Sequence, residues 1–187
     1  MTVKKYLVKI LCIIALFIHK THTFSQGFID KPRKSPIGIA NYKEDSLYIK
    51  ITYGRPRLKN DLALPFGINT KIAQHPYGKI WRTGEDDATE IIITKPVIFC
   101  GTPLKAGIYT IFTIPDSLEW TVILNKEVGM WGTYQYKPEN DVLKVKVPAY
   151  RSPKVFMDFS IFFQKSEEGV DIVMIWGRDA IRLPLFF

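Results

Sequence analysis

Apolar and polar residues alternate with a period of two through most of the chain, and this pattern constrains the fold more than any other feature. In residues 47–53, every second position from Leu47 to Tyr53 is apolar or aromatic. Successive side chains of an extended chain point to opposite faces, so this alternation predicts strands with one buried face. No 11-residue stretch after residue 25 shows convincing helical periodicity. The strands predicted in this way are residues 47–53, 89–93, 97–100, 108–114, 120–124, 143–147, 156–163, 170–176 and 181–185.

Short strands at near-regular spacing, separated by Gly, Pro, Asn and Asp, are typical of a β-sandwich or barrel. We therefore predict one all-β domain, a jelly-roll-like β-sandwich of eight or nine strands. The exception to this regularity is residues 55–87, which are polar and punctuated by Pro and Gly. A connection of this length is usually functional or disordered, and its tryptophan, tyrosine and arginines argue against disorder. We expect it to pack across one end of the sandwich.

The first 25 residues have the three parts of a secretory signal peptide. Three lysines precede a nine-residue apolar run at 10–18, and small residues at positions 23 and 25 stand before Gln26. A membrane-spanning helix needs about 20 apolar residues, so this run is too short to be one. The sequence predicts cleavage after Ser25, a mature domain of residues 26–187 without a transmembrane helix, and a periplasmic or secreted location.

Removing the predicted signal peptide limits the chemistry that the domain can perform. The net charge falls from +8 to +4, because residues 1–25 hold four lysines and no acid. The remaining Lys and Arg are scattered, so we expect no nucleic-acid partner. Only His75 and Cys100 remain of their residue types, which predicts no internal disulfide and argues against a zinc site or a His-dependent triad. We expect no cofactor.

Six motifs carry a resemblance to a known family. They are YGRPRLK (53–59), PYGKIWRTG (76–84), LKAGIYTIFTIP (104–115), EWTVILNK (119–126), WGTYQY (131–136) and DVLKVKV (141–147). Together they resemble the bacterial family named domain of unknown function 2911, over about residues 35–185. The resemblance implies an exported β-rich protein and assigns no activity. Three departures from the family's pattern fall where they would alter recognition of a common ligand. Glu85-Asp86-Asp87 replaces the usual Ala-Asn-Glu, Lys59-Asn60-Asp61 replaces Lys-Gly-Arg, and the stretch 60–75 is longer.

Charged and aromatic residues gather in and beside the long loop. An arginine guanidinium binds carboxylate or phosphate through a planar fork, and a tryptophan ring offers a flat face to a sugar or a cation. Arg55 and Arg82 would supply charge-assisted hydrogen bonds, and Trp81 an apolar wall. We expect a pocket that binds a small molecule, a glycan or an envelope partner. The candidate residues are Tyr53, Arg55, Arg57, Tyr77, Trp81, Arg82, Asp86, Asp87 and Trp131.

Other interpretations of the same residues stay open at this point. Arg55 and Arg82 would pair with Asp86 or Asp87 if the cluster only holds the loop on the sheet. A cofactor-free hydrolase would use Asp86 or Asp87 with a neighbouring arginine. A purely structural envelope protein would need no ligand. The three acids at 85–87 lack the spacing of a calcium-binding loop, so we predict no metal site, and we favour binding over catalysis.

Overall fold

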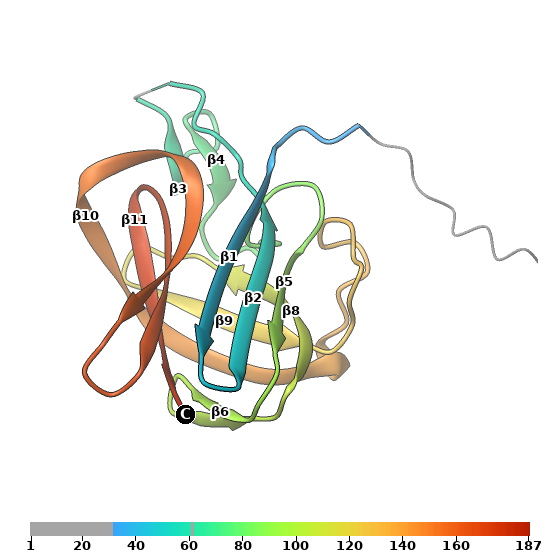
Figure 1. The fold of residues 1–187 in the computed structure, drawn as a ribbon. Helices are drawn as coiled ribbons and strands as arrows, with labels where there is room; N and C mark the ends of the chain where they lie inside the picture. The colour runs from blue at the N-terminus through green and yellow to red at the C-terminus, as the bar shows by residue number, and fades with distance from the viewer. Residues whose placement is uncertain (1–31, 61) are drawn as a thin grey trace, which may run out of the picture. The chain divides into compact units, whose positions relative to one another are not determined.

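The computed structural model describes residues 32–60 and 62–187, so the predicted signal peptide lies outside the described residues. The fold below is that of the compact unit Arg33–Phe187. Within the described residues, this unit holds eleven strands and one 3-10 turn, Pro138–Asn140 (Figure 1). The strands are β1 (Ile37–Glu44), β2 (Leu47–Gly54), β3 (Leu64–Gly67), β4 (Ala73–Pro76), β5 (Thr89–Ile93), β6 (Val97–Phe99), β7 (Thr102–Leu104), β8 (Gly107–Ile114), β9 (Glu119–Asn125), β10 (Asp141–Lys165) and β11 (Val170–Phe186).

Nine of these strands form one antiparallel sheet in the order β1-β2-β5-β8-β9-β10-β11-β6-β7, and β3 and β4 form a separate parallel pair. The nine-stranded sheet folds over into two layers, and strand β10 belongs to both of them. Residues 141–148 pair with β9, and residues 149–165 pair with β11. Figure 1 shows β10 as a long curved ribbon that passes β9 and then turns alongside β11. The prediction of an all-β, sandwich-like fold is confirmed.

The core forms where the alternating apolar faces of the strands meet. A cluster of large aromatic side chains lies at its centre, and Trp81 stacks on Trp176 with ring centroids 5.8 Å apart and an interplanar angle of 9°. Phe66 of β3 packs edge-on against Trp120 at 4.8 Å. Such aromatic pairs add about 0.5–1.5 kcal/mol each beyond the burial of area. Because Phe66 and Trp81 both come from the long loop, the loop is anchored in the core.

Strand β1 was not predicted, because its alternation is reversed. Its inward positions include Gly38 and Ala40, whereas Ile37 and Ile39 face outward and are 54% and 58% exposed. A pattern that places the larger apolar side chains in solvent does not indicate a core strand. The other unpredicted strands, β3, β4 and β7, have four residues or fewer, which is too short for a period to show.

Two predicted pairs of strands are each one continuous strand. Residues 143–147 and 156–163 both belong to β10, and residues 170–176 and 181–185 both belong to β11. Strand β11 bends at Gly177, whose φ is +58°. No helix of the described residues is long and apolar enough to cross a membrane.

Candidate functional site

Residues 82–88, here called the acidic turn, interrupt the pairing of the chain with the neighbouring strand β8. Before the turn, Trp81 exchanges two backbone hydrogen bonds with Thr113, at 2.7 and 2.9 Å. After it, β5 resumes pairing with β8 at Thr89. The Thr89 N–H donates to the Arg82 carbonyl at 3.0 Å and closes the base of the turn. The acidic turn is therefore a closed excursion from the line of one strand.

Buried threonines and a glycine contact fix the shape of the turn. Thr83, Thr89 and Thr113 are fully buried. The Thr89 hydroxyl donates to the Thr83 carbonyl at 2.6 Å, and the Thr83 hydroxyl donates to that of Thr113 at 3.1 Å, so the buried hydroxyls have partners. On the other side, a Cβ added to Gly54 would lie 1.8 Å from the Glu85 carbonyl oxygen. Only glycine permits this approach of two backbones.

The turn holds strained backbone. Thr83 has a φ of +56° and Asp86 a φ of +66°, two of the four positive values at non-glycine residues in the described part of the chain. Positive φ is an outlier for a β-branched residue such as Thr83. Each residue in such a conformation costs on the order of 1–3 kcal/mol, and such residues cluster at functional sites. The strain makes this turn the first place to look for function.

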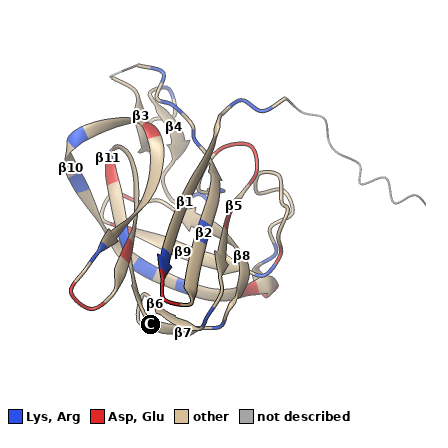
Figure 2. Cartoon of the chain, in the orientation of Figure 1, with Lys and Arg blue, Asp and Glu red and all other residues tan. Residues whose placement is uncertain are grey.

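Asp86 binds the backbone of residues 33–36, here called the leading segment. The Asp86 side chain is buried, and its Oδ2 accepts the backbone N–H groups of Lys34 at 2.9 Å and Ser35 at 3.0 Å. The Ser35 hydroxyl also donates to a Glu85 carboxylate oxygen at 2.5 Å. In Figure 2 the acidic turn is the red stretch that leads into β5, and the leading segment carries blue. Hydrogen bonds to the two carboxylates thus hold two segments together that are about fifty residues apart in the sequence.

The outer acid of the turn contacts two different segments. Asp87 forms an ion pair with Arg33 of the leading segment, and its side chain is 56% exposed. Its backbone makes an isolated bridge with Trp131, which is half-buried. The sequence suggested Arg55 or Arg82 as the partner of these acids if the cluster only held the loop in place. In the structure the paired arginine is Arg33.

A small cavity of about 190 Å³, here called the turn pocket, opens beside the acidic turn. Three charged groups line it: the Arg33 guanidinium and the carboxylates of Asp87 and Glu90. Glu90 is fixed, because one of its carboxylate oxygens accepts the Gly129 N–H at 2.6 Å. The remaining lining comes from Ile37, Thr52, Tyr53, Gly54, Ala88 and Gly129.

Of the predicted site residues, Tyr53, Asp86, Asp87 and Trp131 lie at or beside the acidic turn. The Tyr53 hydroxyl accepts the N–H of Ile161 at 3.0 Å, which ties β2 to β10. Three polar residues that line the turn pocket, Arg33, Thr52 and Glu90, are absent from the site residues predicted from the sequence. The basic Arg33-Lys34 pair opposite an acidic run was the one available signal.

The next two arginines, Arg55 and Arg57, follow β2 and contact β10. Arg55 donates from Nε to the Phe159 carbonyl and from Nη2 to the Ser160 hydroxyl, both at 3.3 Å. Arg57 is exposed and forms an ion pair with Asp158 at 2.8 Å. Neither arginine lines the turn pocket.

The remaining predicted residues lie towards β4 and the core. Trp81 is 4% exposed and packs in the aromatic cluster, and half-buried Tyr77 packs against the same core. The Nε of half-buried Arg82 is buried and has no hydrogen-bond partner among the described residues. Burial lowers the pKa of His75; a hydrogen bond to the Lys79 carbonyl opposes this effect, and the charge of Arg82 adds to it. Arg82 begins the acidic turn, but neither Trp81 nor Arg82 lines the turn pocket, and the ion pairs of Asp86 and Asp87 are with Arg33.

Two groups elsewhere, one buried and one half-buried, have shifted pKa values. Burial raises the pKa of the Asp179 carboxyl, and the ion pair with Arg151 opposes that rise. Burial raises the pKa of the Cys100 thiol to about 12. Within residues 32–60 and 62–187, no group of three or more His, Cys, Asp or Glu side chains is placed to hold a metal ion.

Comparison with known proteins identifies a family and no closer relative. Residues 35–185 match the family described as "protein of unknown function (DUF2911)". No curated protein matches the chain, and no solved structure matches it. The match begins at Ser35 in the leading segment and includes the acidic turn and all eleven strands, except the last residue of β11.

Proposed function

The chain belongs to the DUF2911 family of proteins of unknown function, and on that premise we propose that it is a binding protein of the cell envelope whose turn pocket holds one sugar unit or a similar polyhydroxylated ligand. The observation that carries the proposal is that a strained, internally fixed turn lies beside a pocket that three charged groups line. Strain of this kind persists only where the surrounding structure enforces it.

The size of the pocket supports a small ligand. Sites for drug-sized molecules have volumes of roughly 300–1,000 Å³. The turn pocket, at about 190 Å³, fits a single ring rather than a chain of several. A longer glycan would place one unit in the pocket and leave the rest in solvent.

The groups in the pocket match a ligand rich in hydroxyls. The carboxylates of Asp87 and Glu90 accept hydrogen bonds, the Arg33 guanidinium donates them, and the Thr52 hydroxyl does both. Ile37, which is 54% exposed, offers an apolar contact to the C–H face of a ring. Hydrogen bonds to charged groups contribute about 1.5–3 kcal/mol each, so a few of them are enough for specific recognition.

The pocket walls are held before any ligand arrives. Asp86 fixes the leading segment that carries Arg33, and Gly129 fixes the carboxylate of Glu90. A site that is already ordered loses less conformational entropy when it binds. The envelope location within this proposal rests on the signal-peptide pattern of residues 1–25.

The test is isothermal titration calorimetry of the purified protein with neutral monosaccharides, amino sugars and disaccharides. Glu90→Gln and Thr52→Val change the pocket while conserving side-chain shape. Glu90→Gln should weaken binding about tenfold, which corresponds to the roughly 1.5 kcal/mol of one hydrogen bond to a charged group. Thr52→Val removes a neutral hydrogen bond of about 0.5–1.5 kcal/mol and should weaken binding roughly two- to tenfold. Asp158→Asn, outside the pocket lining, is the matched control and should bind as the wild type does.

Other outcomes would overturn the proposal. Equal binding by wild type and both pocket variants would place the ligand elsewhere. No binding by any sugar in the panel would favour the purely structural interpretation. If the protein released reducing sugar from a glycoside, and Asp87→Asn abolished that activity, the protein would be a cofactor-free hydrolase and not a binding protein.

A further inference from the structure

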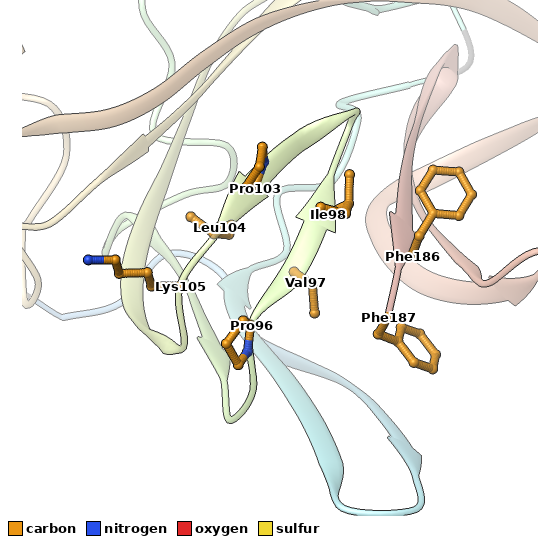
Figure 3. A pocket seen from close by; sticks show the side chains of 8 residues that line it. All are labelled: Pro96, Val97, Ile98, Pro103, Leu104, Lys105, Phe186 and Phe187. Atoms are coloured by element: carbon orange, nitrogen blue, oxygen red, sulfur yellow. The ribbon is translucent and has the colours of Figure 1, made fainter.

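A second, larger hollow lies where β6, β7 and the end of β11 meet, and is here called the edge groove (Figure 3). Its volume is about 550 Å³. Strand pairing sets Ile98 opposite both Phe186 and Pro103, so these three side chains form one row across the three strands. Ile98 is 37% exposed and Phe187 is 52% exposed. The groove shares no lining residue with the turn pocket.

The backbone at this edge is unsuited to adding another strand. Strand β7 is the last in the sheet order and has three residues, of which the middle one is Pro103. Proline has no N–H to donate, and short edge strands with proline are a common protection against edge-to-edge pairing. An occupant of the edge groove is therefore held by side-chain contacts and not by a continued ladder.

Charge is distributed unevenly along the groove. Lys105 is the one charged side chain among the described residues that line it. The pairs Ile93–Gly107 and Val97–Leu104 enclose the turn region that holds exposed Lys95, and so place Lys95 beside Lys105. In Figure 3, Lys105 lies at the β7 side of the view and the two phenylalanines at the β11 side.

An acidic group lies near the phenylalanine end. The Phe187 ring packs on Tyr42 at 5.9 Å, and the Tyr42 hydroxyl donates a hydrogen bond to Glu44. An anion would therefore be attracted to the lysine end and repelled from the phenylalanine end, which gives a bound amphiphile a single orientation.

We propose that the edge groove binds one amphipathic molecule, an acyl chain with a carboxylate head. The chain lies along Phe186, Ile98 and Pro103, and the head lies beside Lys105. The volume of the groove falls within the roughly 300–1,000 Å³ of small-molecule sites, and its lining is apolar with one cation at the rim. This site is independent of the sugar site proposed above.

The test uses the purified protein and the acids octanoate, decanoate and dodecanoate, each as a monomer below its micelle concentration. Burying one methylene is worth about 0.8 kcal/mol, or up to about fourfold in affinity, and the open groove should give at least about twofold per methylene. Decanol and decyltrimethylammonium should bind several-fold more weakly than decanoate. Lys105→Glu should reverse the preference between the anionic and the cationic ligand.

Two variants separate the groove from general apolar adsorption. Ile98→Asp places a charge inside the groove and should weaken decanoate at least tenfold. Ile39→Asp changes an equally apolar and more exposed side chain outside the groove, on β1, and should leave decanoate binding unchanged. Melting curves of both variants confirm that each is folded.

Three results would overturn the proposal. One is equal binding of decanoate, decanol and decyltrimethylammonium. The second is equal weakening by Ile98→Asp and Ile39→Asp. The third is a dimer in sedimentation that Ile98→Asp dissociates, because the occupant would then be a second copy of the chain. Sugar titrations repeated with decanoate bound should be unchanged, which keeps this test separate from that of the turn pocket.

Discussion

Replacing Asp86 by alanine removes the acceptor that holds the leading segment. The backbone N–H groups of Lys34 and Ser35 lose their carboxylate partner, at 2.9 and 3.0 Å. Hydrogen bonds to charged groups contribute about 1.5–3 kcal/mol each, and we take the lower end because a released segment can be hydrated. Alanine at a φ of +66° adds about 1 kcal/mol. The expected loss is about 4 kcal/mol.

That loss corresponds to a fall in Tm of roughly 8–16 °C, at ~2–4 °C per kcal/mol for a domain near this size. Two further variants separate the contributions. Asp86→Gly removes the carboxylate but tolerates the positive φ, so it should be about 1 kcal/mol less destabilising than Asp86→Ala. Asp86→Asn keeps an acceptor oxygen and tolerates this conformation, so its Tm should fall by only about 2–4 °C.

The matched control is the neighbouring acid. Asp87→Ala removes an exposed ion pair with Arg33, and such pairs contribute about 0–1 kcal/mol, so its Tm should fall by less than about 4 °C. Differential scanning calorimetry of the four variants measures all of these values. The reasoning is refuted if Asp86→Ala is no worse than Asp87→Ala. Equal effects of alanine and glycine at position 86 would refute the assignment of backbone strain.

Three more predictions concern perturbed acidities. Burial raises the native pKa of Asp179, against the ion pair with Arg151, so the native state binds this proton more tightly than the unfolded chain does. The free energy of unfolding should therefore fall as pH rises above the ordinary value of 3.8. The Tm of Asp179→Asn minus that of wild type should be larger at pH 7 than at pH 4. With its pKa raised to about 12, Cys100 should resist iodoacetamide at pH 8 in the native protein and react after denaturation, as peptide mass spectrometry would show. Arg82→Met should raise the pKa of His75 in an NMR titration and leave the Tm unchanged or higher, because the Arg82 Nε has no partner among the described residues. An unchanged His75 titration would show that Arg82 does not act on it.

The sequence predicted the strands whose inward positions are β-branched or aromatic, because one buried face imposes a period of two. It failed at β1, where Gly38 and Ala40 face inward and Ile37 and Ile39 face outward. It also failed at the bends inside long strands, because two alternating runs look the same whether a turn or a bend joins them. Gly177 marks such a bend.

The candidate site was predicted in part. The acids of the turn were identified, but their partner Arg33 lies about fifty residues earlier in a segment without periodicity. Trp81 illustrates the limit of composition. A tryptophan next to an arginine in a polar loop fits a ligand wall and a core anchor equally well, and only the long-range packing on Trp176 distinguishes them.

The pairing of β6 with β11 sets an order for assembly. Ile98 and Phe99 of β6 pair with Phe186 and Leu185 of β11, so almost ninety residues separate the partners. Such distant contacts form late, because the intervening chain must first be ordered to reduce the entropy of closing so long a loop. The hairpin of β1 and β2 and the hairpin of β8 and β9 can form first, since each joins neighbours in the sequence. Strands β6 and β7 therefore join the sheet only when β11 has been added. Until then their apolar side chains are exposed, and a chaperone that binds unfolded chains could reach them.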